Sequence, residues 1–443
     1  MKAINRAIEK YEKLILEAER RIWSTPETGF REVKSCAYLA ERFRELGYSL
    51  TMAGDIPGFY TVVDTGREGP EVLVLGELDS VICPKHPESD SETGAVHSCG
   101  HNAQCAALLG VAAALREPDV LEGLVGRIRL CAVPAEELLE IEYRSELKRR
   151  GIIKYFGGKG EFLRRGYFDG VDMAFMIHTG GGASTVNRGA NGCVTKRVIY
   201  KGRATHAANP ETGINALYAA NCGLSAVNAL RETFRESNCI RVHPIITSGG
   251  SMVNAIPDTV TIESYVRGRS YKAILRENAK VNRAFVGAAY SLGANVEIID
   301  APGYTPLLHD TNMMLLAKRA FETAFPEREL RYIPNSIDSG STDMGDLCGL
   351  MPVVHPYCAG AIGTGHGADY YINDPVFACV NSAKWQLMML KLLLSNGAAE
   401  AKRIKAEFVP TYASKEAFFE YIDAICSSGD RITYNDDGTA TVR

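Results

Sequence analysis

Apolar residues recur every three or four positions near the start of the chain, and this spacing predicts amphipathic helices over residues 3–22 and 31–46. Gly47 directly follows the second segment and is typical of a helix end. Nearly continuous apolar runs predict buried strands at 58–64, 71–76, 126–133 and 171–177. Strands of this kind that alternate with helices indicate an α/β layer with a largely parallel central sheet.

The pattern changes near residue 192, where half-apolar strands replace the continuous apolar runs. Strands are expected at 194–200, 240–247, 259–267 and 295–300, and helices at 212–231 and 271–292. This strand–helix–strand–strand–helix–strand order is that of a ferredoxin-like fold. We therefore expect an inserted α+β domain over 192–302 and a discontinuous main domain over 1–191 and 303–443.

The last part of the chain predicts further helices and one hairpin. Helices are expected at 311–325, 375–395 and 415–425. A turn sequence, Asn435-Asp-Asp-Gly438, predicts a hairpin near the end.

The composition is that of an ordinary globular protein, long enough for two domains. The 443 residues are 46% apolar and 23% charged, and the net charge is −4. A nucleic-acid-binding protein usually carries a basic excess, so that class is disfavoured. The first residues lack the apolar core of a signal peptide, and the longest apolar run, 106–115, is about half a bilayer span. We expect a cytoplasmic protein without a membrane partner.

One of the twelve cysteines is a candidate metal ligand. No Cys-x-x-Cys pair occurs, so neither a zinc ribbon nor a thioredoxin motif is present, and most thiols should be reduced and buried. Cys99, however, lies two positions before His101, with Gly100 between them. A thiolate beside an imidazole suits zinc, manganese or nickel, and the alternative is a structural cysteine of the core.

Other groups able to bind a metal or to move a proton follow Cys99 in the chain. Glu136 and Glu137 come directly after the strand at 126–133, where one carboxylate can bind a metal while the other acts as a general base. His178 follows the strand at 171–177, and His206 and His366 stand among small residues that leave an imidazole accessible. Each of these residues alone is commonly structural or solvated. Their joint order indicates a metal site.

The stretch 138–170 is rich in charged residues and contains Gly157-Gly-Lys-Gly160. Its spacing is not that of a phosphate-binding Walker loop. Runs of charge are usually solvated, so we interpret the stretch as an exposed helix and loop. A lid, or an insertion that contacts the substrate, is the alternative.

Seven ordered motifs over residues 25–395, together with His366, resemble those of the M20 metallopeptidase family. They are most similar to its amidohydrolase branch, which includes N-acyl-amino-acid and aminobenzoyl-glutamate hydrolases. The motifs are Pro26-Glu-Thr-Gly29, Gly76-Glu-Leu-Asp79, His97-Ser-Cys-Gly-His101, Pro134-Ala-Glu-Glu137, Gly202-Arg-Ala-Thr-His206-Ala-Ala-Asn-Pro210, Asn254-Ala-Ile-Pro-Asp258 and Ser341-Thr-Asp343. The resemblance implies a zinc-peptidase-like catalytic domain with a mixed, largely parallel sheet, and an inserted ferredoxin-like dimerisation or lid domain over 192–302.

The resemblance also implies a role for each candidate residue. Two divalent metal ions (zinc, manganese, nickel or cobalt) are expected on Cys99, His101, Glu137, His178 and His366. Glu136 would be the general base, which takes a proton from water and passes it to the leaving amine. His206 would stabilise the oxyanion across the interface of a homodimer. Asn254 and Arg267 would bind the substrate carboxylate, and Asp79 would orient a ligand histidine.

The chain departs from the branch at a few positions. The branch usually has Asp and His where this chain has Asn102 and Gln104, so a charge and an imidazole next to the metal motif are missing. The loop 83–96 and the charged stretch 138–170 also differ, and such regions shape the substrate pocket.

The leading hypothesis is a metal-dependent amidohydrolase that cleaves an N-acyl amino acid, an aminoacyl conjugate or a short dipeptide. A dipeptidase or aminopeptidase of the same family is the first alternative. The second is a metal-depleted relative that acts as a binding or assembly protein, because a fold and a motif do not guarantee activity.

Overall fold

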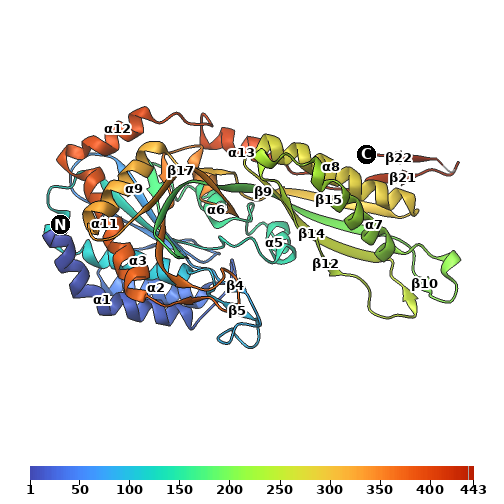
Figure 1. The fold of residues 1–443 in the computed structure, drawn as a ribbon, viewed down its shortest axis with the longest axis horizontal. Coiled ribbons are helices and arrows are strands. Elements are labelled where there is room, and N and C mark those ends of the chain that lie inside the picture. Colours follow the sequence, from blue (N-terminus) through green and yellow to red (C-terminus); the bar gives the residue numbers. More distant parts are fainter. Residues whose placement is uncertain (438) are drawn as a thin grey trace. The chain divides into compact units, whose positions relative to one another are not determined.

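The computed structural model describes residues 1–437 and 439–443. The chain folds into two compact units (Figure 1). The first unit contains Met1–Gly189, Leu307–Asp338 and Thr342–Lys415. The second contains Ala190–Pro306, Ser339–Ser341 and Glu416–Arg443. The sequence assigned all of 303–443 to the main domain, whereas residues 416–443 make their contacts within the second unit.

A six-stranded mixed sheet forms the centre of the first unit. In spatial order its strands are β1 (Thr51–Met52), β2 (Phe59–Asp64), β6 (Arg127–Val133), β3 (Glu71–Glu77), β7 (Met173–Phe175) and β18 (Val353–Val354). The pairs from β6 to β18 are parallel, and β1 and β2 are antiparallel to their neighbours. All residues of β3 are buried, which explains its continuous apolar sequence. The predicted α/β class with a mixed, largely parallel sheet is confirmed.

Helix α3 (His101–Ala114) is the central helix of this unit, and all of its residues are buried. Beyond its polar first turn it carries almost only apolar residues, and it packs against β3, α1 (Lys2–Trp23) and α11 (Ser382–Leu394) (Figure 1). The other helical segments are α2 (Val33–Glu45), α4 (Pro118–Leu121), α5 (Ile141–Arg149), α6 (Gly158–Arg164), α9 (Thr311–Ala324), α10 (Gly345–Cys348), η4 (Val376–Asn381), η5 (Asn396–Ala398) and α12 (Ala399–Glu407). The predicted helix at 375–395 is present, but its first part, η4, is a π-helix.

Short strands complete the first unit. They are β4 (Val81–Ile82), β5 (Ala95–Val96), β8 (His178–Gly181), β16 (Leu307–Leu308), β19 (Tyr357–Ile362) and β20 (Tyr371–Ile372). Strands β9 (Thr185–Lys201) and β17 (Arg331–Ser341) begin in this unit and end in the second. Among the residues that the structure describes, no helix combines the length and the apolar character needed to cross a lipid bilayer.

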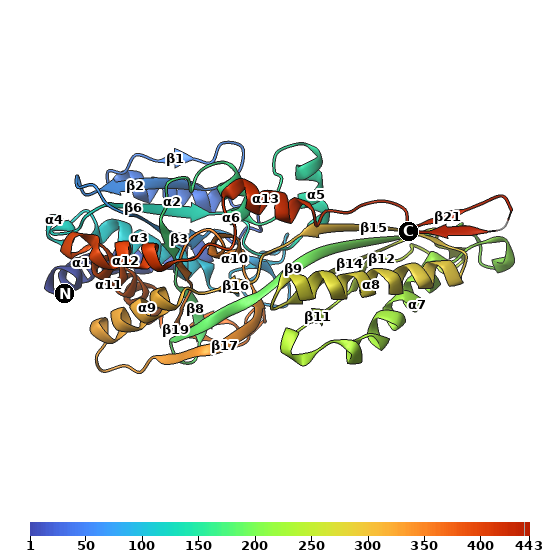
Figure 2. The same ribbon diagram turned by 90° about the horizontal axis from the view of Figure 1, so that it is seen from above.

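The second unit has the ferredoxin-like order, which is confirmed. Its antiparallel strands are β9, β11 (Arg241–Val242), β12 (Ile245–Ser248), β14 (Thr259–Gly268) and β15 (Asn295–Pro302), with β9 between β14 and β15. Figure 2 shows α7 (Ala216–Ala229) and α8 (Tyr271–Ser291) side by side against this sheet. The strand expected at 240–247 is divided into β11 and β12. Between β9 and β14 lie β10 (Thr205–His206), η1 (Pro210–Thr212), η2 (Arg231–Thr233), η3 (Glu236–Asn238) and β13 (Ala255–Ile256).

The end of the chain lies along the free edge of β15. Backbone hydrogen bonds join Asp300 to Ser427 and Val296 to Arg431, and they bring residues 416–443 into the second unit. The segment contains most of α13 (Lys415–Asp423) and the paired strands β21 (Ile432–Tyr434) and β22 (Ala440–Val442). The hairpin predicted here is confirmed, although Gly438 of its turn lies outside the described residues.

The charged stretch 138–170 is the solvated helix and loop that we expected only in part: Glu142, Arg149 and Lys154 are exposed, but three other charged residues are not. It forms α5 and α6, and the side chains of Arg144, Lys159 and Glu161 are buried. Each has charged or carbonyl partners in the interior, which offset the cost of removing its charge from water. The interpretation was wrong for these three residues, because burial of a charge depends on partners that the local sequence does not show.

Candidate functional site

The predicted site residues of the first unit follow the ends of three neighbouring parallel strands. Glu77 ends β3 and Asp79 follows it, Glu136 and Glu137 follow β6, and His178 begins β8 soon after β7. Because β6, β3 and β7 are adjacent and parallel, their carboxyl ends meet at one edge of the sheet. Sites in α/β proteins are built at this edge.

The Cys99-Gly100-His101 motif forms the turn that begins α3. Gly100 has φ 88°, a left-handed conformation, and a Cβ atom at this position would collide with the hydroxyl of Tyr370. Glycine is therefore required for both conformation and space. The turn brings Cys99 to the edge of the sheet and buries His101 completely.

The five predicted metal ligands lie together and form two groups that share Cys99. One group is Cys99, His101 and His178, and the other is Cys99, Glu137 and His366; within each group the possible ligand atoms lie within 4.8 Å of one another. Sγ of Cys99 lies 3.6 Å from Nε2 of His178. Nε2 of His366 lies 2.9 Å from Oε1 of Glu137. A thiolate common to two sets of nitrogen and oxygen donors fits two adjacent divalent ions.

Asp79 fixes the orientation of His101. Nδ1 of His101 donates to the backbone oxygen of Asp79 at 2.9 Å and lies 3.1 Å from its Oδ1. Oδ2 of the same carboxylate accepts the backbone N–H of Glu137 at 2.7 Å. Nε2 of His101 is buried without a hydrogen-bond partner in the described structure, as a nitrogen that faces a metal position would be.

The charges in this cluster shift the pKa of several groups. Burial and Glu137 oppose ionisation of Cys99, but His101 and His178 bring the pKa of its thiol down to about 6. Burial opposes ionisation of Glu137 too, yet the neighbouring His366 brings its pKa to about 2. The carboxylate of Glu137, with Cys99, raises the pKa of His366 to about 11. The site therefore holds its thiolate and this carboxylate in their charged forms.

Glu136 lies in a different electrostatic environment from Glu137. Burial, and then the negative charges of Glu77 and Glu137, raise the pKa of Glu136 well above its ordinary value. Its Oε2 lies 3.9 Å from Nε2 of His101, so the carboxyl group is next to one of the two ligand groups. A buried carboxyl group with a raised pKa can accept and return a proton near neutral pH.

Lys159 is a buried residue of the site that the sequence analysis missed. Its Nζ lies 2.5 Å from Oε1 of Glu77 and contacts Oδ1 of Asp343, and its backbone N–H donates to Oδ2 of Asp343 at 2.8 Å. The other oxygen of Glu77 lies 3.3 Å from Nε2 of His101. The signal in the sequence was a lysine between Gly158 and Gly160. A side chain at Gly158 would collide with the carbonyl of Pro134, so this glycine lets α6 pack against residues 134–137, here called the catalytic loop because they carry the predicted base Glu136.

The two departures from the family motif bind buried carboxylates. Asn102 Nδ2 donates to Oε1 of Glu19 at 2.8 Å, and Gln104 Nε2 donates to Oε2 of Glu77 at 2.8 Å. Neither amide belongs to the two ligand groups that share Cys99. The departures thus change the partners of carboxylates around the site and leave the ligand set intact.

The remaining predicted residues, His206, Asn254 and Arg267, belong to the second unit. His206 in β10 pairs with Ala255 in β13, so it lies beside Asn254, and both side chains are exposed. Arg267 pairs with Cys193 at the opposite end of β14 from Thr259, about 27 Å away at the usual rise of a strand. In a single copy of the second unit, Asn254 and Arg267 are therefore far apart.

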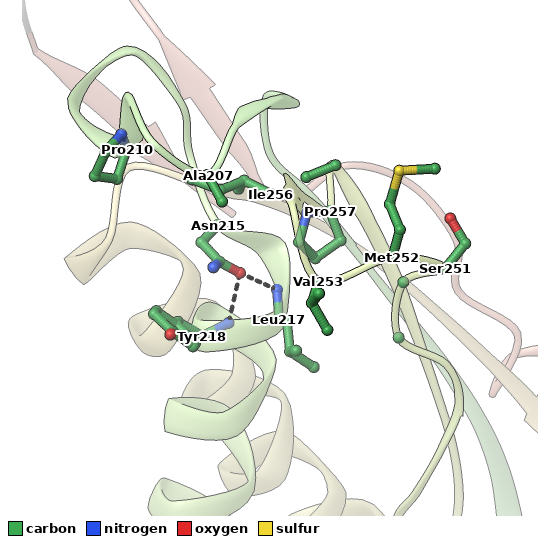
Figure 3. Close-up of a pocket in the computed structure, with 13 residues that line it drawn as sticks. Ala207, Pro210, Asn215, Leu217, Tyr218, Ser251, Met252, Val253, Ile256 and Pro257 are labelled. Atoms are coloured by element: carbon green, nitrogen blue, oxygen red, sulfur yellow. Dashed lines mark hydrogen bonds between the residues drawn. The ribbon is translucent and has the colours of Figure 1, made fainter.

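A cavity of about 540 Å³ adjoins the His206–Asn254 region. Figure 3 shows Ala207, Met252, Val253 and Ile256 around it, with the first turn of α7 at its base. Asn215 caps that helix, because its Oδ1 accepts the backbone N–H groups of Leu217 and Tyr218 at 3.0 and 3.1 Å. Met252 and Val253 are largely exposed, so this side of the unit presents an apolar surface.

Comparisons with known proteins identify the family and the fold. A model of peptidase family M20/M25/M40 matches residues 73–383. N-acetyl-L-cysteine deacetylase from Bacillus subtilis (strain 168) is 27% identical over 333 residues, 71% of this chain and 73% of that protein. Xaa-Arg dipeptidase from Mus musculus is 28% identical over 356 residues, 76% of this chain and 74% of that protein. A dinuclear metal-binding M20 peptidase from Bacillus subtilis has a similar fold, with a TM-score of 0.63 at 18% identity, and covers 87% of this chain and 99% of that one.

Proposed function

Because the chain belongs to peptidase family M20/M25/M40, we propose that this metal-dependent hydrolase cleaves the amide bond of an N-acyl amino acid, an aminoacyl conjugate or a short dipeptide. One observation carries the proposal. Two groups of metal-binding side chains share Cys99, and Glu136, a carboxyl group with a raised pKa, lies beside them. A binding protein without metals would not need all of these side chains together in one place.

Cys99, His101, Glu137, His178 and His366 would hold two divalent ions, and their mixed sulfur, nitrogen and oxygen donors suit zinc, manganese, nickel or cobalt. When bound, such a pair lowers the pKa of a coordinated water and polarises the amide carbonyl. Asp79 keeps His101 in the orientation that binding requires, since it engages Nδ1 and leaves Nε2 for the ion.

Glu136 carries the proton in this mechanism. Its carboxylate takes a proton from the attacking water and then delivers it to the nitrogen of the leaving amine, so that the amide C–N bond breaks without releasing an unstable amide anion. The raised pKa of Glu136 supports this role, because a base of ordinary acidity would return the proton less readily at neutral pH.

We propose that the protein works as a homodimer through residues 192–302. The edge of the sheet at β15 is occupied by the chain's own residues 427–431, whereas all residues of β12 at the other edge are exposed. Exposed apolar side chains lie nearby, at Tyr218, Ile245, Ile246, Met252 and Val253. A second copy would cover them and would offer His206 and Asn254 to the partner's site, while Arg267 would grip a substrate carboxylate.

The relatives favour two kinds of substrate, an N-acyl amino acid and a dipeptide. Peptidase activity on a free amino terminus requires a carboxylate that binds the ammonium group, whereas deacylation requires a space for the acyl group. The alternative to an N-acyl amino acid hydrolase is thus a dipeptidase or aminopeptidase. All twelve cysteines are free, and this agrees with the reducing cytoplasm that we propose as its location.

A hydrolysis screen with metal analysis tests this function. Protein purified without chelators should hold about two divalent ions per chain, and it should release amino acids from N-acetyl amino acids, from aminobenzoyl-glutamate or from dipeptides. Removal of the metals with a chelator should abolish turnover, and added metal should restore it. A preparation that holds two metals and hydrolyses none of these substrates would contradict the proposal.

A further inference from the structure

Ala135, the residue before Glu136, has a strained backbone conformation. Its φ is 57°, in the left-handed region that a residue with a Cβ atom rarely adopts. Such a conformation persists when the surrounding structure holds it. The groups that hold Ala135 therefore determine where the carboxyl group of Glu136 lies.

Three groups hold the backbone of this loop. The carboxylate of Glu32, which is fully buried, accepts the N–H of Ala135 at 2.7 Å. The carbonyl of Ala135 accepts the N–H of Gly158 at 3.2 Å. Arg144 supplies the third group: its guanidinium lies 3.4 Å from the carbonyl oxygen of Ala135 and donates to the carbonyls of Glu137 and Phe156.

Arg144 is built into this position. It is 1% exposed, and its guanidinium lies 5.4 Å from the ring centroid of Phe30. A side chain at Gly29 would collide with that guanidinium and would lie 3.0 Å from Ala135. The glycine of the Pro26-Glu-Thr-Gly29 motif thus leaves the space through which Arg144 reaches the loop.

Helix α5, which carries Arg144, is itself attached to the segment around Gly29. The carboxylate of Glu140, directly before the helix, accepts a hydrogen bond from Thr28 and lies 3.3 Å from Arg31. Arg31 also lies over the ring of Tyr143, 3.5 Å from its centroid. These contacts fix the end of α5 from which Arg144 points to the catalytic loop.

We propose that α5 is a support for the general base, and that Arg144 is a positioning residue that keeps Glu136 in place through the carbonyls of Ala135 and Glu137. This inference rests on the proposed role of Glu136 in amide hydrolysis. It assigns a function to part of the charged stretch 138–170: Arg144 acts on the catalytic loop, whereas other charged residues of α5, such as Arg149, are exposed.

The test compares Arg144→Met with Arg149→Met, a matched change at an exposed arginine of the same helix that is paired with Glu146. Arg144→Met should lower kcat roughly 100-fold, as small displacements of catalytic groups do, with KM unchanged; the metal content of each sample is measured and kcat is compared at equal metal content, because Arg144 also contacts the backbone of Glu137. Arg149→Met should keep wild-type kcat. Arg144→Lys, which retains the charge and is less disruptive to folding, should lower kcat by a smaller factor.

A second substitution separates positioning from a general loss of stability. Glycine adopts a positive φ without strain. The double variant Ala135→Gly, Arg144→Met should therefore have a kcat at least about tenfold higher than that of Arg144→Met alone. The assays are run where circular dichroism shows every variant fully folded, so that a general loss of stability does not change kcat. Wild-type kcat in Arg144→Met, or a loss that Ala135→Gly does not restore, would overturn the proposal.

Hydrogen exchange provides a measurement that does not depend on activity. The amides of Ala135 and Glu137 donate to Glu32 and Asp79, so Arg144→Met should speed their exchange and Arg149→Met should not. If the wild-type protein hydrolyses no amide, the proposed function fails while this result still decides whether Arg144 holds the loop. Unchanged exchange in Arg144→Met would overturn the inference.

Discussion

Sγ of Cys99 lies 3.6 Å from Nε2 of His178, and Cys99 also belongs to the group that contains Glu137 and His366. One side chain therefore connects the two sets of metal-binding residues. A ligand shared by two ions contributes to the affinity of both, so its loss should affect both positions.

Cys99→Ser should reduce the metal content from about two ions per chain to fewer than one, because a hydroxyl is a much weaker ligand for these ions than a thiolate. Elemental analysis after dialysis against metal-free buffer measures this. Cys105→Ser is a matched control: Cys105 lies in α3, the helix that follows the Cys99 turn, and donates to the carbonyl of Glu77, a bond that serine can keep. Loss of one ion with full retention of the other would show that Cys99 serves one position.

Glu136→Gln should lower turnover by about 100- to 10,000-fold, the range of general acid–base catalysis. Turnover should fall because the amide cannot accept the proton from water. The variant should keep its metals because the amide is close to the carboxyl group in size. Turnover under saturating substrate and metal content of the same sample check this. Near wild-type activity would mean that another residue is the base.

Mixing two inactive variants tests whether His206 acts from the partner subunit. Homodimers of Glu136→Gln and of His206→Ala should both be nearly inactive. A heterodimer contains one site with an intact Glu136 and the partner's intact His206, so random mixing should restore about a quarter of wild-type activity. Unfolding and refolding of the mixture before the assay permits exchange of subunits. No recovery in verified heterodimers would place both residues in the same subunit's site.

The elements and the ligand candidates could be predicted because their signals are local. The apolar period of α1 and the continuous apolar run of β3 directly reflect which sides are buried. Cys99 and His101 could be found because their spacing fits a turn before a helix. Their grouping with His366, more than 250 residues away, came from the family resemblance, since no local pattern connects them.

The buried charges could not be predicted, because no local pattern shows which distant residues surround them. Lys159 and Arg144 occur in a stretch whose composition is typical of a solvated helix. Lys159 is buried because Glu77 and Asp343, from distant segments, surround it, and Arg144 is buried because carbonyl groups of the catalytic loop accept its hydrogen bonds. The position of His206 relative to Asn254 likewise depends on the pairing of β10 with β13.

Lys159→Met should destabilise the protein by roughly 3–5 kcal/mol, because it leaves Glu77 and Asp343 buried without their cation. Urea unfolding followed by circular dichroism measures the change. Lys154→Met, at an exposed lysine nearby, should change the free energy of unfolding by less than about 0.5 kcal/mol. Asp343→Asn added to Lys159→Met should recover part of the loss, since it removes one of the unpaired charges. Equal stability of the two lysine variants would argue against the buried ion pairs.

His309 should make the protein less stable in weak acid. Its Nδ1–H donates to the carbonyl of Asn187 at 2.9 Å and its Nε2 accepts the N–H of His355 at 3.1 Å, so the folded protein holds the neutral ring. Burial lowers the pKa of His309 to about 4, against 6.5 for an exposed histidine. The unfolded chain therefore binds more protons between these values, and stability is complete above pH 6.5 and is lost as the pH falls to 4, by up to about 3 kcal/mol. His309→Gln should be less stable than wild type at pH 7, and the difference should shrink by most of this amount at pH 4.5 in urea unfolding. A constant difference in the free energy of unfolding between wild type and His309→Gln from pH 7 to pH 4.5 would contradict the prediction.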